Sequence, residues 1–129
     1  MATSSAVTTG QQATAAQYNN LRTDMLGNLE YTELVSTTHV VTNNNTWEDW
    51  DVSGIVPAGT TEVELWINLL TGGNYGARKN GSALNRYFEW SVAAGWITMW
   101  VPLDSSRICE IYAPNTASTF QVIGYLTRL

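Results

Sequence analysis

The period of the hydrophobic pattern changes at Tyr31, and this change most constrains the fold. From Tyr31 onward, β-branched and aromatic residues form short runs that Gly, Asn, Pro and Asp interrupt. No second helical pattern separates the runs, which excludes an alternating β-α arrangement. We therefore expect a mainly β chain whose residues 31–129 form an antiparallel, jelly-roll-like β-sandwich of about eight strands. The expected strands are 31–42, 47–52, 62–70, 75–79, 87–92, 96–102, 107–113 and 119–127.

One of these runs carries information beyond its strand period. Residues 62–65 alternate polar and apolar side chains, and the run then becomes almost continuously apolar from Leu65 to Leu69. Such a run predicts a strand that is covered on both faces in its second half. The helix described next, or another subunit, is the expected cover.

Before the sandwich, the pattern over residues 14–29 is helical. Thr14 and Gln17 have the spacing of a capping box, and Gly27 and Asn28 are expected to end the helix. The apolar positions, three or four residues apart, are Tyr18, Leu21, Met25 and Leu29. Two interpretations stay open: the stripe packs on its own sandwich, or it forms a seam between identical helices, because it is as narrow as a coiled-coil line.

Residues 1–13 precede this helix and are rich in Ala, Thr, Ser and Gln. This composition has nothing to bury by itself, so we expect an extended N-terminal arm that is disordered alone and is held by a neighbouring subunit.

The charge pattern restricts the possible partners. Six Lys and Arg residues stand against eleven Asp and Glu in 129 residues, and they form no basic stripe, so nucleic acid is not an expected partner. No apolar run approaches the roughly 18 residues that a membrane span needs, and no signal peptide is evident. We expect a protein that is made in the cytoplasm and has no membrane partner. A surface with so few charges desolvates readily against another protein, which favours an assembly component.

The residues that could carry catalysis form no recognised motif. His39 and Cys109 are the only histidine and cysteine, they lie far apart in the sequence, and Cys109 is expected to be a buried thiol. Glu89 and Glu110 are the mid-strand carboxylates to test for a glycosidase pair. We expect neither catalytic residues nor a cofactor, and hence no enzyme.

A cluster of carboxylates occurs at Glu48, Asp49 and Asp51. Three carboxylates in four residues can hold a hard cation such as Ca²⁺. In a strand, however, Asp49 and Asp51 share a face while Glu48 points away, and the calcium-loop spacing is missing. We therefore expect no metal site.

Six tryptophans in a short chain are compatible with a carbohydrate platform, since flat rings stack on sugar faces. The candidate platform residues are Trp47, Trp50 and Trp96. The competing interpretation, in which each ring belongs to the core or to an interface, applies to all of them.

Two stretches resemble small β-sandwich surface proteins of tailed bacteriophage virions. The segment from Val7 through residues 15–24 is similar to the helix that opens many phage fibre and spike proteins. The second stretch is similar to capsid-decoration and head- or tail-fibre modules, and it includes residues 51–60, Arg78-Lys79-Asn80-Gly81, residues 100–105 and the closing Gly124-Tyr125-Leu126. The resemblance implies a homotrimer on the capsid or tail, in contact with a major capsid, tail or vertex protein.

From these features we expect a non-enzymatic virion structural protein, a surface decoration or short fibre protein that is anchored through its arm and helix. The alternative is a receptor-binding module at a tail tip whose tryptophans bind host-surface glycan.

Overall fold

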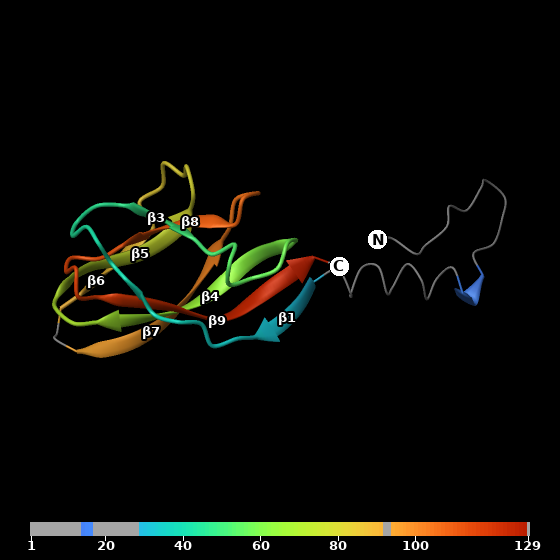
Figure 1. The fold of residues 1–129 in the computed structure, drawn as a ribbon, viewed down its shortest axis with the longest axis horizontal. Helices are drawn as coiled ribbons and strands as arrows, with labels where there is room; N and C mark the ends of the chain where they lie inside the picture. Colours follow the sequence, from blue (N-terminus) through green and yellow to red (C-terminus); the bar gives the residue numbers. More distant parts are fainter. Residues whose placement is uncertain (1–13, 17–28, 92–93, 129) are drawn as a thin grey trace.

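The structure, a computed structural model, describes residues 14–16, 29–91 and 94–128. In this part of the chain, nine strands form two antiparallel sheets that face each other (Figure 1). The expected β-sandwich is confirmed. The strands are β1 (Leu29–Glu33), β2 (His39–Val40), β3 (Glu48–Asp51), β4 (Thr60–Leu69), β5 (Gly73–Lys79), β6 (Tyr87–Trp90), β7 (Gly95–Pro102), β8 (Ile108–Tyr112) and β9 (Thr119–Arg128).

The strand order is that of a jelly roll. One sheet has the order β1-β9-β4-β7, with β2 also paired to β9, and the other has the order β3-β8-β5-β6. A chain that doubles back as one long hairpin pairs its first strand with its last, and so on inward. Here β1 and β2 pair with β9, β3 with β8, β4 with β7 and β5 with β6. Rolling up this nested hairpin produces the two sheets.

The core lies between the sheets and follows the period of two that the sequence shows. On β4, Val63, Leu65, Ile67 and Leu69 are fully buried, while the alternate side chains point outward. The opposite sheet contributes Tyr75, Ala77, Cys109 and Ile111 to the same cluster.

The expected strand 31–42 is wrong as a single element, because the structure divides it into β1 and β2. Between them, Leu34 N–H and Ser36 N–H still donate to β9, at the carbonyls of Ile123 and Val122 (3.0 Å each). The hydroxyl of Ser36 also accepts the N–H of Val122 at 3.0 Å, in place of a main-chain carbonyl. A side chain thus interrupts the ladder, which the hydrophobic period does not reveal.

The expected helix is only partly within the described residues. Ala15 and Ala16 are helical, whereas Tyr18, Leu21 and Met25 lie outside the described residues, as does the arm 1–13. Leu29, expected at the end of the helical stripe, is instead the first residue of β1, where it pairs with Arg128 and is 55% exposed. The apolar side chain of Leu29 therefore lies on a strand and not on a helical stripe.

Candidate interaction surfaces

The three tryptophans expected to form a glycan platform lie in three different places. Trp50 is 5% exposed and belongs to the core. Trp47 packs beside Tyr87 and Tyr112 of the four-stranded sheet, whereas Trp96 is on β7 of the five-stranded sheet. Residues three apart in an extended chain point to opposite faces, which separates Trp47 from Trp50. The three rings therefore do not share one surface, and glycan binding by any of them stays a prediction.

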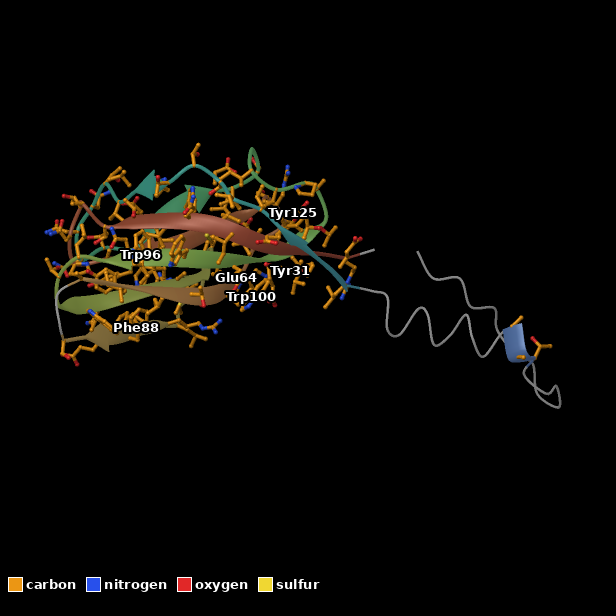
Figure 2. The ribbon with its side chains drawn as sticks, turned by 90° about the horizontal axis from the view of Figure 1, so that it is seen from below. Tyr31, Glu64, Phe88, Trp96, Trp100 and Tyr125 are labelled. Carbon is orange, nitrogen blue, oxygen red and sulfur yellow. The ribbon has the colours of Figure 1, made fainter. Side chains whose placement is uncertain are left out.

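Among the described residues, the largest group of exposed rings lies on the outer side of the five-stranded sheet (Figure 2). We call it the aromatic face: Tyr31 of β1, Trp66 of β4, and Trp96 and Trp100 of β7. These side chains are 49%, 39%, 49% and 39% exposed, respectively. Soluble monomers rarely leave such rings together on one surface, so the aromatic face has the character of an interaction site.

The rings of the aromatic face contact one another in two pairs. The Trp66 and Trp96 ring centroids are 4.5 Å apart at an interplanar angle of 44°. Tyr31 meets Trp100 edge to face at 5.9 Å and 65°. Both geometries are favourable for aromatic pairs, so the rings are held by each other while their outer sides stay open.

Tyr31 reaches across the sheet because β9 has a glycine beneath it. A Cβ at Gly124 would lie 2.5 Å from the Tyr31 ring and hydroxyl, so only glycine leaves room for the ring. The phenol crosses β9 and donates to Glu64 Oε2 on β4 at 3.2 Å. Desolvation, then the hydrogen bond to Glu64 and the neighbouring carboxylates, raise the pKa of Tyr31 above 10.0. The phenol therefore stays protonated and donating.

The apolar second half of β4 is explained in part by this arrangement. Trp66 points outward and is covered on one side by Trp96, while Leu65 and Ile67 point into the core. The sequence predicts that this half of the strand is covered on both faces: its inner face is buried, whereas Trp66 on the outer face stays 39% exposed within the described residues. Cover by the helix or by another subunit stays a prediction.

A second, smaller group of rings lies on the four-stranded sheet. We call it the Trp47 cluster: Trp47, Tyr87 and Tyr112, whose ring centroids are 5.2 to 6.3 Å apart. The Arg78 guanidinium carbon lies 4.1 Å from the Trp47 ring centroid, and Arg78 binds Glu110 through two hydrogen bonds of 2.8 and 3.2 Å. Tyr87 is the exposed ring of the cluster, at 41%.

The candidate catalytic groups have structural partners, and the structure does not pair them with each other. His39 stacks on Trp50, with ring centroids 4.9 Å apart, and its Nε2 lies 3.0 Å from Glu48 Oε1. Cys109 is fully buried, and burial raises the pKa of its thiol to about 12. A thiol with this pKa is a poor nucleophile at neutral pH.

The two carboxylates considered for glycoside hydrolysis differ in environment. Glu110 is bound by Arg78, while Glu89 is exposed on β6 and lies opposite Asn74 of β5. Neither carboxylate lies in an apolar pocket: one is in an ion pair and the other faces solvent.

Glu48 of the acidic cluster holds the chain between β2 and β3. Its Oε2 accepts the N–H of Thr42 (3.0 Å), the N–H of Asn43 (2.9 Å) and the Thr42 hydroxyl (2.9 Å). Burial raises its pKa, but the hydrogen bonds from His39, Asn43 and Thr42 outweigh this effect and hold the pKa below 4.5. Asp49 and Asp51 are exposed on the other side of β3, as the strand period predicts. Across the described parts of the chain, no three His, Cys, Asp or Glu side chains are grouped to hold a metal ion.

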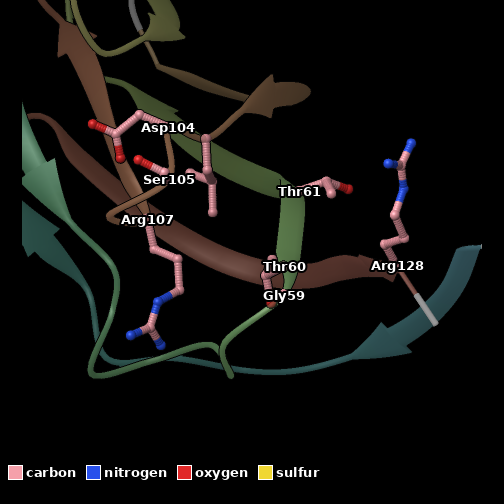
Figure 3. Close-up of a pocket in the computed structure, with 8 residues that line it drawn as sticks. Gly59, Thr60, Thr61, Asp104, Ser105, Arg107 and Arg128 are labelled. Carbon is pink, nitrogen blue, oxygen red and sulfur yellow. The ribbon is translucent and has the colours of Figure 1, made fainter. Parts of the chain in front are cut away.

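A shallow pocket lies where the β7–β8 turn meets the start of β4 (Figure 3). Asp104 lines it, but its carboxylate already accepts the N–H groups of Ser106 and Ile108 and the side-chain amide of Asn80. The Arg107 guanidinium donates to the carbonyls of Ser53 and Val56. These polar groups fix the turn.

The fold and surfaces together define a jelly-roll β-sandwich with one exposed aromatic sheet face. No family model and no curated protein matches the sequence. Among solved structures, the chain is similar to the coat protein of Tobacco streak virus, seen as a dimer. The identity is 11% and the TM-score 0.45, over 78% of this chain and 86% of the coat protein. Within residues 14–16, 29–91 and 94–128, no helix is long and apolar enough to cross a bilayer.

Proposed function

We propose that this chain is a non-enzymatic structural protein of a virus particle that assembles through its aromatic face. The observation that carries the proposal is the set of four half-exposed rings on one sheet. Burying them would remove a large apolar area from water, at roughly 25 cal/mol per Å². Because the chain has few charges for steering, apolar contact of this kind suits a permanent assembly better than a transient one.

The jelly-roll order supports the same proposal. Jelly rolls are used by viral capsid domains, lectins and cupins, so the fold favours these classes without choosing among them. The choice among these classes rests on the surfaces. The polar groups of the described pocket, Asp104 and Arg107, are used to hold a turn, whereas the aromatic face leaves apolar area open for contact with a partner.

The finer form of the proposal is a homotrimeric surface decoration or short fibre of the tailed-bacteriophage type, made in the host cytoplasm. Residues 1–13 and the stripe Tyr18, Leu21 and Met25 would anchor it to a capsid, tail or vertex protein. The resemblance in residues 7–24 supports this form.

Loading onto particles tests the proposal. The variant Trp66→Asp places a carboxylate in the middle of the aromatic face, while Glu89→Gln alters an exposed side chain on the other sheet. Quantitative mass spectrometry of purified particles should find the native chain and Glu89→Gln at equal copy number and Trp66→Asp largely lost. Equal loading of all three chains, each shown folded by circular dichroism, would contradict the proposal.

A second candidate function is glycan binding at the tip of a tail. The Trp47 cluster favours it, because the exposed Tyr87 ring stacks on Trp47, and the Trp47 ring in turn contacts Arg78, which Glu110 holds in place. Aromatic rings beside fixed hydrogen-bonding groups are suited to sugars. Binding to host-surface glycans that Tyr87→Ala abolishes and Trp66→Ala leaves intact would support this candidate. Equal loss in both variants would contradict it.

A further inference from the structure

The free edge of β7 is the least protected sheet edge in the described structure. β7 ends its sheet and pairs only with β4 (Figure 1). Alternate N–H and C=O groups therefore point outward along the strand, except that Pro102 at its end has no N–H to donate. Exposed edges are normally shortened, charged or bulged, because an open edge pairs with other chains. β7 has no charged residue, and the sequence has none from Trp90 to Leu103.

The other three edges have this protection. β1 has five residues and includes Glu30 and Glu33, while β2 has two residues. β3 has four residues, of which three are carboxylates. β6 also has four residues and includes Glu89. Among the edge strands described, β7 alone is both long and without charge.

The sequence of β7 is nearly palindromic about Thr98, reading Trp96-Ile97-Thr98-Met99-Trp100. If two copies pair antiparallel about a two-fold axis at Thr98, Trp96 of each copy lies opposite Trp100 of the other. The same register places Ile97 opposite Met99 on the inner face. A two-fold interface requires a self-complementary surface, and this strand provides one.

Charge further favours a second copy at this edge. Each chain carries a formal charge of −5, so two copies repel wherever their carboxylates approach. The strand β7 is where they can meet without such contacts. Cross-strand aromatic pairs further stabilise such a contact.

We propose that the edge of β7 pairs antiparallel with β7 of a second copy, joining two five-stranded sheets into one. The two aromatic faces then become continuous across the two-fold axis. This contact is independent of the trimer proposed above, because it uses β7 and involves none of residues 14–28.

The full-length chain and two substitutions at Thr98, an exposed residue of β7, test the proposal. Thr98→Lys places two like charges directly opposite each other, which destabilises the pair, while Thr98→Val keeps the shape and the β-branch. Light scattering should show that Thr98→Lys lowers the mass by a factor of two or more and that Thr98→Val keeps it. The chain mass is 14.2 kDa. If the mass of Thr98→Lys is still three times that of one chain, the trimer forms without the β7 contact. A folded Thr98→Lys with the native mass would overturn the proposal.

Cross-linking gives a second readout that does not depend on the lysine variant. Thr98→Cys places the two thiols opposite each other in this register. The control is Val35→Cys: Val35 is 77% exposed and lies between β1 and β2, at the opposite edge of the sheet. Cys109 stays unreactive because it is buried. Mild oxidation should convert Thr98→Cys, and not Val35→Cys, into covalent dimers. Equal cross-linking of the two variants would overturn the proposal. A native mass that falls only when residues 1–13 are deleted would also overturn it, because the arm and not β7 would then hold the copies together.

Discussion

Replacing Gly124 tests how the aromatic face is held. Glycine inside a strand is less stable than alanine by roughly 0.5–1 kcal/mol, yet a Cβ at Gly124 would lie 2.5 Å from the Tyr31 ring. Gly124→Ala should therefore displace the ring. The protein would lose the edge-to-face contact with Trp100, worth about 0.5–1.5 kcal/mol, and the hydrogen bond to Glu64, worth about 0.5–1.5 kcal/mol. After the gain from alanine, we expect a net loss of about 1 kcal/mol.

A double-mutant cycle separates this cause from a general effect on β9. In the Tyr31→Ala background the ring is absent, so Gly124→Ala should be neutral or stabilising by about 0.5 kcal/mol. Urea unfolding of the four chains should thus give a coupling of about 1.5 kcal/mol. Gly54→Ala, where nothing lies within 4 Å of the new Cβ, is the control and should change stability little. The same effect of Gly124→Ala in both backgrounds would refute the reasoning.

Further predictions concern the core, the thiol and Glu48. Leu65→Ala, at a fully buried site, should lower the free energy of unfolding by about 3 kcal/mol in urea titrations; a loss below about 1 kcal/mol would contradict the packing. Cys109 should react with a thiol reagent only after unfolding, because burial raises its pKa to about 12; rapid labelling of the folded chain would contradict its burial. Because the pKa of Glu48 is lowered, its stabilisation is present above its ordinary pKa of 4.5 and is lost as the pH falls through the lowered value. Melting temperatures between about pH 5 and 3 should therefore depend less on pH in Glu48→Gln than in native protein; parallel curves would contradict this role.

Much of the fold follows from local pattern. The period of two in β4 and the Gly, Asn and Pro residues between runs predict most strands to within a few residues, because burial on one face selects alternation. The nested pairing of β1 with β9 and β4 with β7 is a property of the whole chain. Periodicity favours a sandwich without determining this order, since pairing depends on contacts far apart in sequence.

The site was less predictable for the same reason. The separation of Trp47 from Trp50 could have been found from their odd spacing in an extended segment. The contact of Tyr31 with Glu64 joins residues 33 apart, and it depends on the missing side chain of Gly124. A glycine in a strand signals close approach of another group, but the sequence does not show which group approaches.

The most direct test of assembly through the aromatic face compares tryptophan oxidation in the isolated chain with oxidation in purified particles. The probe is Trp66, which is 39% exposed and central in that face, and Trp47 of the other sheet is the internal reference. Hydroxyl-radical footprinting read by mass spectrometry should show Trp66 protected in particles and Trp47 labelled equally in both states. Equal labelling of Trp66 in both states, or protection of Trp47 alone, would contradict assembly through the aromatic face.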